Sequence, residues 1–217
     1  YYYINSKYFE ELGYFELYRA MLVADAESKN IFKDVPKFRD LVEYERLLPR
    51  SVALADSERV KGLFSKQRWE DFTHDVNYVS PSQPSGGWRY FFIDHGYNPP
   101  PTWTLIGGTL SRLVPIEQIK QITMIDFYLV LLMFGVVFWT FGPATGLVAV
   151  AFFLVTFSGR WPMLGQAVLR FDWLCAVVIG VCMLKKERFL IAGALLGYAA
   201  WTRIFPGIFV FPFAVVF

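Results

Sequence analysis

The chain has 217 residues, of which 55% are hydrophobic and 19% aromatic, a larger apolar share than an ordinary soluble domain uses. Its net charge is only +2, so it lacks the basic surface of a nucleic-acid-binding protein, and we exclude that class of partner. Residues 1–121 carry 15 Lys and Arg with 16 Asp and Glu, whereas residues 122–217 carry 6 and 3. This division predicts a water-facing region, 1–121, followed by a membrane region, 122–217.

The water-facing region is predicted to be mostly helical. Between residues 5 and 26 the apolar and aromatic positions recur at helical spacing with one interruption at Gly13, which predicts two short helices. Residues 39–48 are interpreted as a third helix. Residues 65–79 are interpreted as a fourth, with Ser65 as its N-cap. Residues 103–114 are expected to form an apolar or interfacial helix that leads into the membrane region.

Residues 80–101 are rich in Pro, Gly, Ser and aromatic residues, a composition that predicts an irregular loop or a lid. This segment also contains Asp94, His95, Tyr97 and Asn98 close together. Long irregular segments in compact proteins are more often functional than structural. We therefore expect part of the functional site here.

The membrane region consists of successive apolar segments. Residues 124–141 form the clearest of them, with a length sufficient to span a bilayer core. The others are shorter than a straight spanning helix, so we expect them to borrow flanking residues or to be broken helices. They cover residues 144–157, 172–184, 189–203 and 204–217, the last being incomplete. The predicted fold class is an all-α polytopic membrane protein with a large helical loop and a bundle of short or broken transmembrane helices.

The basic cluster at residues 185–188 is expected to face the cytoplasm under the positive-inside rule. Counting back through the segments places residues 1–121 on the extracytoplasmic side of a bacterial inner membrane or an equivalent membrane. The chain begins at Tyr1 without Met and ends inside an apolar run, so we expect a fragment of a longer protein.

Three arginines are expected at the outer edge of the membrane: Arg160, Arg170 and Arg203. Arginine suits phosphate because its planar guanidinium offers a fork of donors, and the phosphate of a lipid lies at this depth. Arg203 lies beside Pro206 within an apolar run, a position that requires a polar partner. Arg160 and Arg170 also fit the simpler interpretation of interfacial cations whose side chains reach toward water.

Three short sequence motifs resemble those of the GT-C superfamily of membrane glycosyltransferases. They are residues 7–14 (KYFEELGY), residues 94–100 (DHGYNPP), and residues 192–197 (AGALLG) leading to Arg203 and Pro206. In that superfamily the first membrane helix is followed by a large exterior loop, and sugars are taken from polyprenyl-phosphate donors on the outer face. The resemblance implies that this chain begins just inside the loop. The superfamily's main acidic residue would then precede Tyr1, so it matches no residue of this sequence.

The resemblance implies an integral membrane enzyme that transfers a hexosyl or pentosyl group from a polyprenyl-phosphate donor. The acceptor would be an extracytoplasmic glycan, lipid or protein. Sugar transfer needs a carboxylate to activate the acceptor hydroxyl and positive charge for the departing phosphate. Asp94 and His95 are the catalytic candidates, although this pair is also typical of a simple turn.

Substrate contacts are expected at four residues of these sequence motifs and at the three arginines. The four motif residues are Lys7, Glu11, Tyr97 and Asn98. The lipid bilayer is the remaining expected partner.

The sequence predicts no metal site made by the protein alone, because His74 and His95 are its two histidines and show no ligand spacing. A divalent cation is the one cofactor that the chemistry leaves open. Two other functions also remain open. One is a multi-spanning transporter, since broken helices and a buried Arg suit transport as well. The other is a non-catalytic membrane subunit whose exterior region binds a partner.

Overall fold

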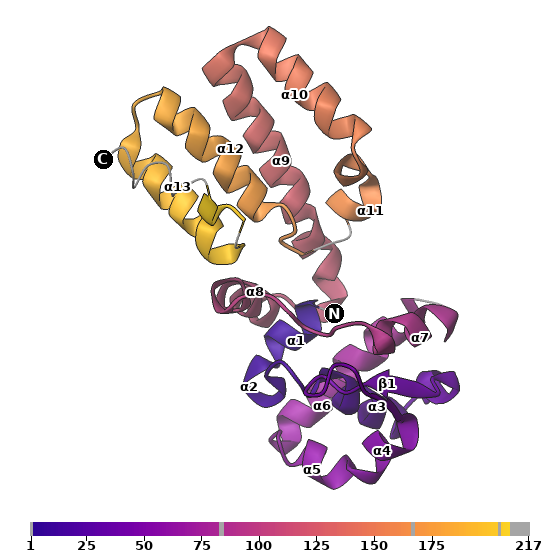
Figure 1. Ribbon diagram of the computed structural model, residues 1–217. Coiled ribbons are helices and arrows are strands. Elements are labelled where there is room, and N and C mark those ends of the chain that lie inside the picture. The colour runs from indigo at the N-terminus through magenta and orange to yellow at the C-terminus, as the bar shows by residue number, and fades with distance from the viewer. Residues whose placement is uncertain (1, 83–84, 166–167, 204, 209–217) are drawn as a thin grey trace. The chain divides into compact units, whose positions relative to one another are not determined.

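The computed structural model describes residues 2–82, 85–165, 168–203 and 205–208. The chain is mostly helical, as expected for the all-α class. It forms two compact units (Figure 1). Unit 1 comprises Tyr1–Pro99 with Thr104–Glu117, and unit 2 comprises Pro100–Trp103 with Gln118–Phe217. The assignment of residues 1–121 to water and of residues 122–217 to a membrane stays a prediction.

Unit 1 contains short helices and one small hairpin. Its elements are α1 (Tyr2–Lys7), α2 (Phe9–Leu12), α3 (Leu17–Ala26), η1 (Ile31–Asp34), β1 (Lys37–Arg39), β2 (Leu47–Pro49), α4 (Arg50–Ala55), α5 (Ser57–Lys61), α6 (Lys66–Val79), η2 (Ser80–Ser82), α7 (Ser85–Ile93) and most of α8 (Pro101–Leu113). The predicted break at Gly13 is confirmed, since this residue ends α2 with a φ of 51°. The predicted cap of α6 is also confirmed, because the Ser65 side chain accepts a hydrogen bond from the backbone N–H of Arg68.

The helix predicted at residues 39–48 is wrong, because this stretch belongs to a hairpin. Strands β1 and β2 pair in antiparallel register, with Phe38 opposite Leu48. Both side chains are buried, whereas most residues between them are exposed. The Asp40 side chain also accepts a hydrogen bond from the backbone N–H of Val42 and so starts the turn. Pairing of two apolar residues across the turn thus outweighed the weak local helical pattern.

The prediction of an irregular segment at residues 80–101 is wrong in its middle, where helix α7 forms. Trp88, Phe91 and Phe92 lie on this helix, and the rings of Trp88 and Phe92 pack against Phe32 at centroid distances of 4.8 and 5.1 Å. Burial of these large rings in the core of unit 1 outweighs the low helix propensity of the glycines at the start of α7. Residues 94–100, after α7, have no regular structure, as predicted.

Helix α8 packs closely against α1. A side chain at Gly108 would place its Cβ 2.9 Å from the carbonyl oxygen of Ser6, so only glycine permits this approach. The hydroxyls of Ser6 and Ser111 lie 3.3 Å apart in the same contact, and the Tyr3 hydroxyl donates a hydrogen bond to the carbonyl of Val114. The helix predicted at residues 103–114 is therefore confirmed and is held by small residues.

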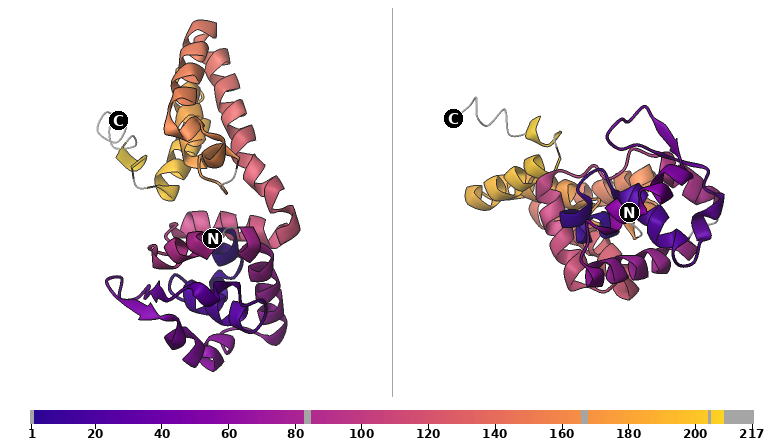
Figure 2. Two further views of the ribbon diagram at one scale, coloured as in Figure 1. Left: turned by 90° about the vertical axis from the view of Figure 1, so that its right-hand side faces the viewer. Right: turned by 90° about the horizontal axis from the view of Figure 1, so that it is seen from below.

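In the described residues, unit 2 has four longer helices and two short turns of helix, and η3 (Ile116–Gln118) precedes them in the sequence. Its elements are α9 (Ile119–Phe141), α10 (Pro143–Val155), η4 (Phe157–Gly159), α11 (Trp161–Leu164), α12 (Asp172–Lys185) and α13 (Phe189–Thr202). Helix α9 packs against both α10 and α12, and α12 packs against α13. The side view in Figure 2 shows these helices overlapping in one narrow layer.

Four of the predicted apolar segments coincide with α9, α10, α12 and α13, while most of residues 204–217 lie outside the described residues. Within the described part of the chain, one helix, Ile116–Phe141, is long and apolar enough to cross a membrane. Helices α10 and α13 are apolar but shorter. The number of membrane spans therefore stays a prediction.

The layer formed by unit 2 leaves many large apolar side chains exposed. Those more than half exposed include Tyr128, Leu132, Trp139, Leu147, Val148, Phe152, Leu154, Leu190 and Trp201. Because the helices form one layer, only residues at the seams between neighbours are buried, such as Val130 and Cys175. An apolar surface of this extent is unfavourable in water and marks a face that contacts lipid or protein.

Candidate functional site

The nine residues predicted for the site are divided between the two units. Unit 1 contains Lys7, Glu11, Asp94, His95, Tyr97 and Asn98, and unit 2 contains Arg160, Arg170 and Arg203.

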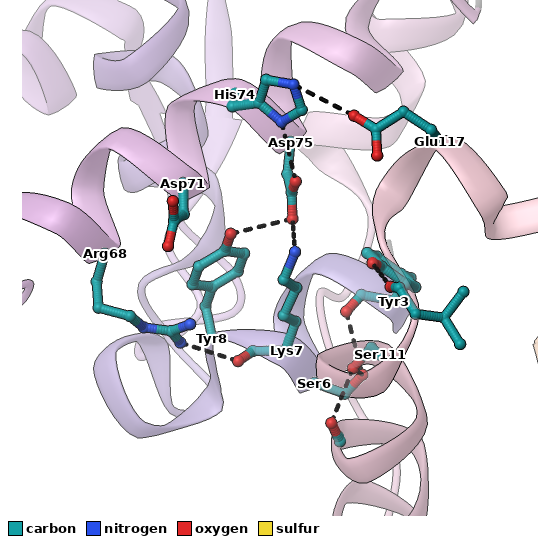
Figure 3. A network of polar contacts seen from close by, with 12 residues as sticks. Tyr3, Ser6, Lys7, Tyr8, Arg68, Asp71, His74, Asp75, Ser111 and Glu117 are labelled. Atoms are coloured by element: carbon teal, nitrogen blue, oxygen red, sulfur yellow. Dashed lines mark hydrogen bonds and ion pairs between the residues drawn. The ribbon is translucent and has the colours of Figure 1, made fainter.

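Lys7 belongs to a buried polar network between α1 and α6 (Figure 3). Its Nζ lies 2.6 Å from Oδ2 of Asp75, and the Tyr8 hydroxyl donates a hydrogen bond of 3.0 Å to the same oxygen. The His74 ring extends this network toward the surface, with Nδ1 at 3.4 Å from Asp75 and Nε2 at 3.3 Å from Glu117. Burial, and then the charge of Asp75, raise the pKa of Tyr8 well above its usual value. Lys7 thus already holds an anionic partner within unit 1.

Glu11 is engaged in a similar way. Its two carboxylate oxygens accept hydrogen bonds from Nε and Nη2 of Arg68 at 2.5 and 3.1 Å. The Arg68 guanidinium also lies 4.4 Å from the centre of the Tyr8 ring. The hydrogen bond to Glu11 is the main cause that raises the pKa of Arg68. This bidentate pair fastens α2 to α6, which gives Glu11 a structural role besides the substrate contact predicted for it.

Tyr97 and Asn98 lie in or beside a cluster of aromatic side chains in unit 1. The Tyr97 ring is buried, and its centroid lies within 6 Å of those of Tyr2, Phe9 and Tyr14. Its hydroxyl donates a hydrogen bond to Oγ1 of Thr104, while burial raises the pKa of Tyr97 above its usual value. Asn98 is exposed and accepts a hydrogen bond of 3.0 Å from the Tyr2 hydroxyl.

Asp94 and His95 form an exposed pair in the turn after α7. Their side chains are 65% and 69% exposed, and Oδ1 of Asp94 lies 3.8 Å from Nδ1 of His95. The His95 ring also stacks near Tyr44 at a centroid distance of 6.1 Å. Gly96 adopts a φ of 76°, and a Cβ at this position would lie 2.6 Å from the Leu41 side chain. The turn therefore favours glycine at this position. The structure thus shows a solvent-facing turn at the predicted catalytic pair.

At one end of unit 2 the apolar helices meet in a polar group, here called the polar cluster. It consists of Asp126, Arg170, Asp172, Tyr198 and Arg203. The start of α9 supplies Asp126, the start of α12 supplies Asp172, and the end of α13 supplies Tyr198. Arg170 and Arg203 lie in the segments just before α12 and just after α13. The up-and-down order of the helices brings these positions together.

Asp126 fixes the loop that precedes α12. This side chain is fully buried, and its two oxygens accept hydrogen bonds from the backbone N–H groups of Arg170 at 2.8 Å and Phe171 at 3.0 Å. The bond uses only the backbone of Arg170; its exposed side chain turns to α11, where Nη1 lies 2.6 Å from Sδ of Met163. A buried carboxylate thereby positions a cation at the surface of the cluster.

Asp172 is the second buried carboxylate of the polar cluster, with 6% of its surface exposed. Its Oδ2 accepts a hydrogen bond of 2.6 Å from the Tyr198 hydroxyl, which ties α12 to α13. Its Oδ1 is buried and has no hydrogen-bond partner among the described residues. Arg203 is near enough for its charge to act on this carboxylate. Buried polar atoms are almost always satisfied, so the unpaired Oδ1 is an unusual feature of this carboxylate.

The structure brings Arg170 and Arg203 together with carboxylates that the sequence interpretation did not select. Arg160 lies at the start of α11 and is exposed, with its guanidinium over the Phe157 ring. The neighbouring Trp161 packs on Phe127 of α9, next to Asp126. An acidic residue in an apolar segment was the signal that could have identified Asp126 and Asp172.

The arrangement combines cations for an anionic group with one carboxylate oxygen available to a hydrogen-bond donor. Within the described ranges, no three His, Cys, Asp or Glu side chains are grouped so that they could hold a metal ion. The fold and the site define a mostly helical protein with an apolar helical unit that ends in an arginine-containing polar cluster. No family model, curated protein or solved structure matches this chain.

Proposed function

We propose that this chain is part of an integral membrane glycosyltransferase that transfers a hexose or pentose from a polyprenyl-phosphate donor to an extracytoplasmic acceptor. The observation that carries this proposal is the polar cluster, because it places Arg170 and Arg203 beside buried carboxylates at one end of an otherwise apolar layer. The short sequence motifs that resemble those of GT-C enzymes also support a glycosyltransferase.

A bilayer is the proposed environment of unit 2. Its exposed surface is dominated by large apolar side chains, which lipid would cover without cost. Helices α12 and α13 have 14 residues each. Such a helix is about 21 Å long, whereas the hydrocarbon core is about 30 Å thick. Ends of helices this short would lie at or below the headgroup level, where the phosphate of a polyprenyl lipid is within reach.

A phosphate fits the arginines better than a neutral headgroup. Arg160 and Arg170 are exposed residues, and guanidinium donors match phosphate oxygens in pairs. Departure of the lipid phosphate leaves negative charge during sugar transfer, and fixed cations stabilise it. The basic residues 185–188, at the other end of α12, would then face the cytoplasm.

The first test measures binding of polyprenyl phosphate and of the neutral polyprenol of equal length to the protein in nanodiscs. We expect tighter binding of the phosphate, and about a tenfold loss of that preference in Arg170→Gln or Arg203→Gln, since a charge-assisted hydrogen bond is lost. Arg188→Gln is the matched control, because this exposed arginine lies at the other end of the layer.

The second test measures transfer of radiolabelled sugar from a panel of polyprenyl-phosphate hexoses and pentoses to octyl glycosides. Transfer that requires the phosphate-linked donor and falls in the Arg170 and Arg203 variants supports the proposal. Equal binding of the phosphate and the polyprenol, together with the absence of transfer from every donor of the panel, would overturn it.

A further inference from the structure

The geometry points to Asp172 as the catalytic residue that accepts the proton of the acceptor hydroxyl, with Tyr198 as its positioning residue. This inference rests on the proposed function and assigns a role to the bare Oδ1 of Asp172. Neither the resemblance nor the sequence interpretation selected this residue.

The two buried carboxylates of the polar cluster differ in what their oxygens can still do. Both oxygens of Asp126 are occupied by backbone N–H groups at 2.8 and 3.0 Å, so this side chain serves the loop before α12. Asp172 uses only Oδ2, which the Tyr198 hydroxyl holds at 2.6 Å. The hydrogen bond fixes the orientation of the carboxylate. Oδ1 has no hydrogen-bond partner among the described residues, although the backbone N–H groups of Asp172 and Trp173, at the start of α12, act on the carboxylate. Of the two carboxylates, Asp172 is the one with an oxygen that accepts no hydrogen bond from the described residues, so Oδ1 is the more open position for a proton.

The surroundings of Asp172 suit this step. Arg203 lies near enough to act on Asp172 through its charge, so a phosphate bound by Arg203 would lie close to the carboxylate. The carboxylate is covered in the free protein, with 6% of its residue surface exposed. The acceptor must therefore displace the covering side chains as it binds. Exclusion of water before the acceptor arrives protects the donor from hydrolysis.

The step is a simple displacement. The O–H bond of the acceptor breaks, and its proton passes to Oδ1 of Asp172. The acceptor oxygen forms a bond to the anomeric carbon, and the bond between that carbon and the phosphate oxygen breaks. The electron pair of this bond leaves with the lipid phosphate, whose charge the arginines balance. No oxidant or reductant takes part.

The test compares Asp172→Asn with Asp172→Glu in the same transfer assay. Asn keeps the shape and an oxygen for Tyr198 but cannot take a proton, whereas Glu keeps a carboxylate one methylene further out. Because a general base contributes at least about 100-fold, we expect Asp172→Asn to lower kcat by that factor. Asp172→Glu should retain at least about tenfold more activity than Asp172→Asn, and Asp172→Glu, which keeps the charge beside Arg203, should bind polyprenyl phosphate as the wild type does. Glu187→Gln, an exposed carboxylate at the other end of α12, is the matched control.

The outcomes separate the inference from the proposed function. If the wild type transfers sugar and Asp172→Asn keeps kcat within about threefold, the role of Asp172 is wrong while the function stands. If Asp172→Glu is less active than Asp172→Asn, the residue acts through its shape, which also overturns the inference. If the wild type transfers sugar from no donor of the panel, the proposed function falls and the inference with it.

A second variant covers the case in which Asp172→Asn does not fold. Tyr198→Phe keeps the carboxylate and removes only the hydroxyl that orients it. We expect a fall of about tenfold in kcat with unchanged binding of polyprenyl phosphate, as for the loss of one orienting hydrogen bond. An unchanged kcat in Tyr198→Phe would contradict the positioning role and the proton transfer that depends on it.

Discussion

The Nζ of Lys7 lies 2.6 Å from Oδ2 of Asp75, and the two side chains are only 15% and 3% exposed. This pair joins α1 to α6 inside unit 1. A buried charge is costly without its partner, so the two groups depend on each other. The Tyr8 hydroxyl donates to the same carboxylate oxygen and completes the buried network.

We expect Asp75→Asn to destabilise unit 1 by about 3 kcal/mol, because it leaves the Lys7 ammonium buried without a counter-charge. Hydrogen exchange of the amides of α1 and α6, with the protein in detergent, measures the effect. The double variant Lys7→Met with Asp75→Asn should be closer to the wild type, since Asn still accepts from Tyr8. Glu43→Gln is a control, because Glu43 pairs with Arg46 at the exposed surface. Equal losses in the single and the double variant would contradict this account.

We expect Asp126→Asn to release the loop before α12. The amide of Asn would present N–H groups to one of the two backbone donors, at Arg170 and Phe171, that Asp126 now satisfies. An unsatisfied buried donor costs about 1–3 kcal/mol. Hydrogen exchange at the amides of Arg170 and Phe171 should therefore become about 10- to 100-fold faster, and Glu187→Gln should leave it unchanged. Unchanged protection of both amides would show that the carboxylate does not hold the loop.

Asp56 gives unit 1 a dependence on pH. The hydrogen bond from Arg59, with further help from Arg19, holds the pKa of Asp56 below its ordinary value of 3.8 in spite of partial burial. A group whose folded pKa is lowered contributes stability that is fully present above the unfolded pKa and is lost as the pH falls through the lowered folded pKa. The free energies of unfolding of the wild type and Asp56→Asn, followed from about pH 6 to about pH 3, should differ by about 1 kcal/mol at the upper end, and this difference should shrink toward the lower end. If the difference in the free energy of unfolding grows as the pH falls, the pKa of Asp56 is raised by folding and not lowered, which would contradict this account.

Gly108→Ala tests the close contact of α8 with α1. The added Cβ would lie 2.9 Å from the carbonyl oxygen of Ser6, a backbone atom that cannot turn aside. We expect a loss of at least about 1 kcal/mol, although alanine is otherwise the better helix former. Gly86→Ala in α7 is the matched control, because its Cβ meets no atom within 4 Å. Exchange of the Ser111 amide measures the result, and equal protection in the two variants would contradict the packing described.

Local patterns were sufficient for the elements whose stability is itself local. Ser65 caps α6 as its sequence predicts, since the cap bonds to an N–H only three residues away. Apolar runs likewise located α9, α10, α12 and α13, because a run of such residues forms a helix in nearly any apolar surroundings. The hairpin at residues 39–48 was missed because it depends on the pairing of Phe38 with Leu48 across the turn. Helix α7 was missed because it depends on burial against Phe32, which is distant in the sequence.

In the candidate site, too, some residues could be selected from the sequence and others only from the tertiary structure. Arg170 and Arg203 were selected from the sequence because they lie at or within apolar segments, and their contact with a substrate stays a prediction. Nothing in the sequence pairs Asp126 with the residues 44 and 45 positions later, or Asp172 with a tyrosine 26 positions later. These pairings arise because the helices run up and down, so that the start of one lies beside the end of the next. Only that packing shows which carboxylate is fully satisfied and which keeps an oxygen free.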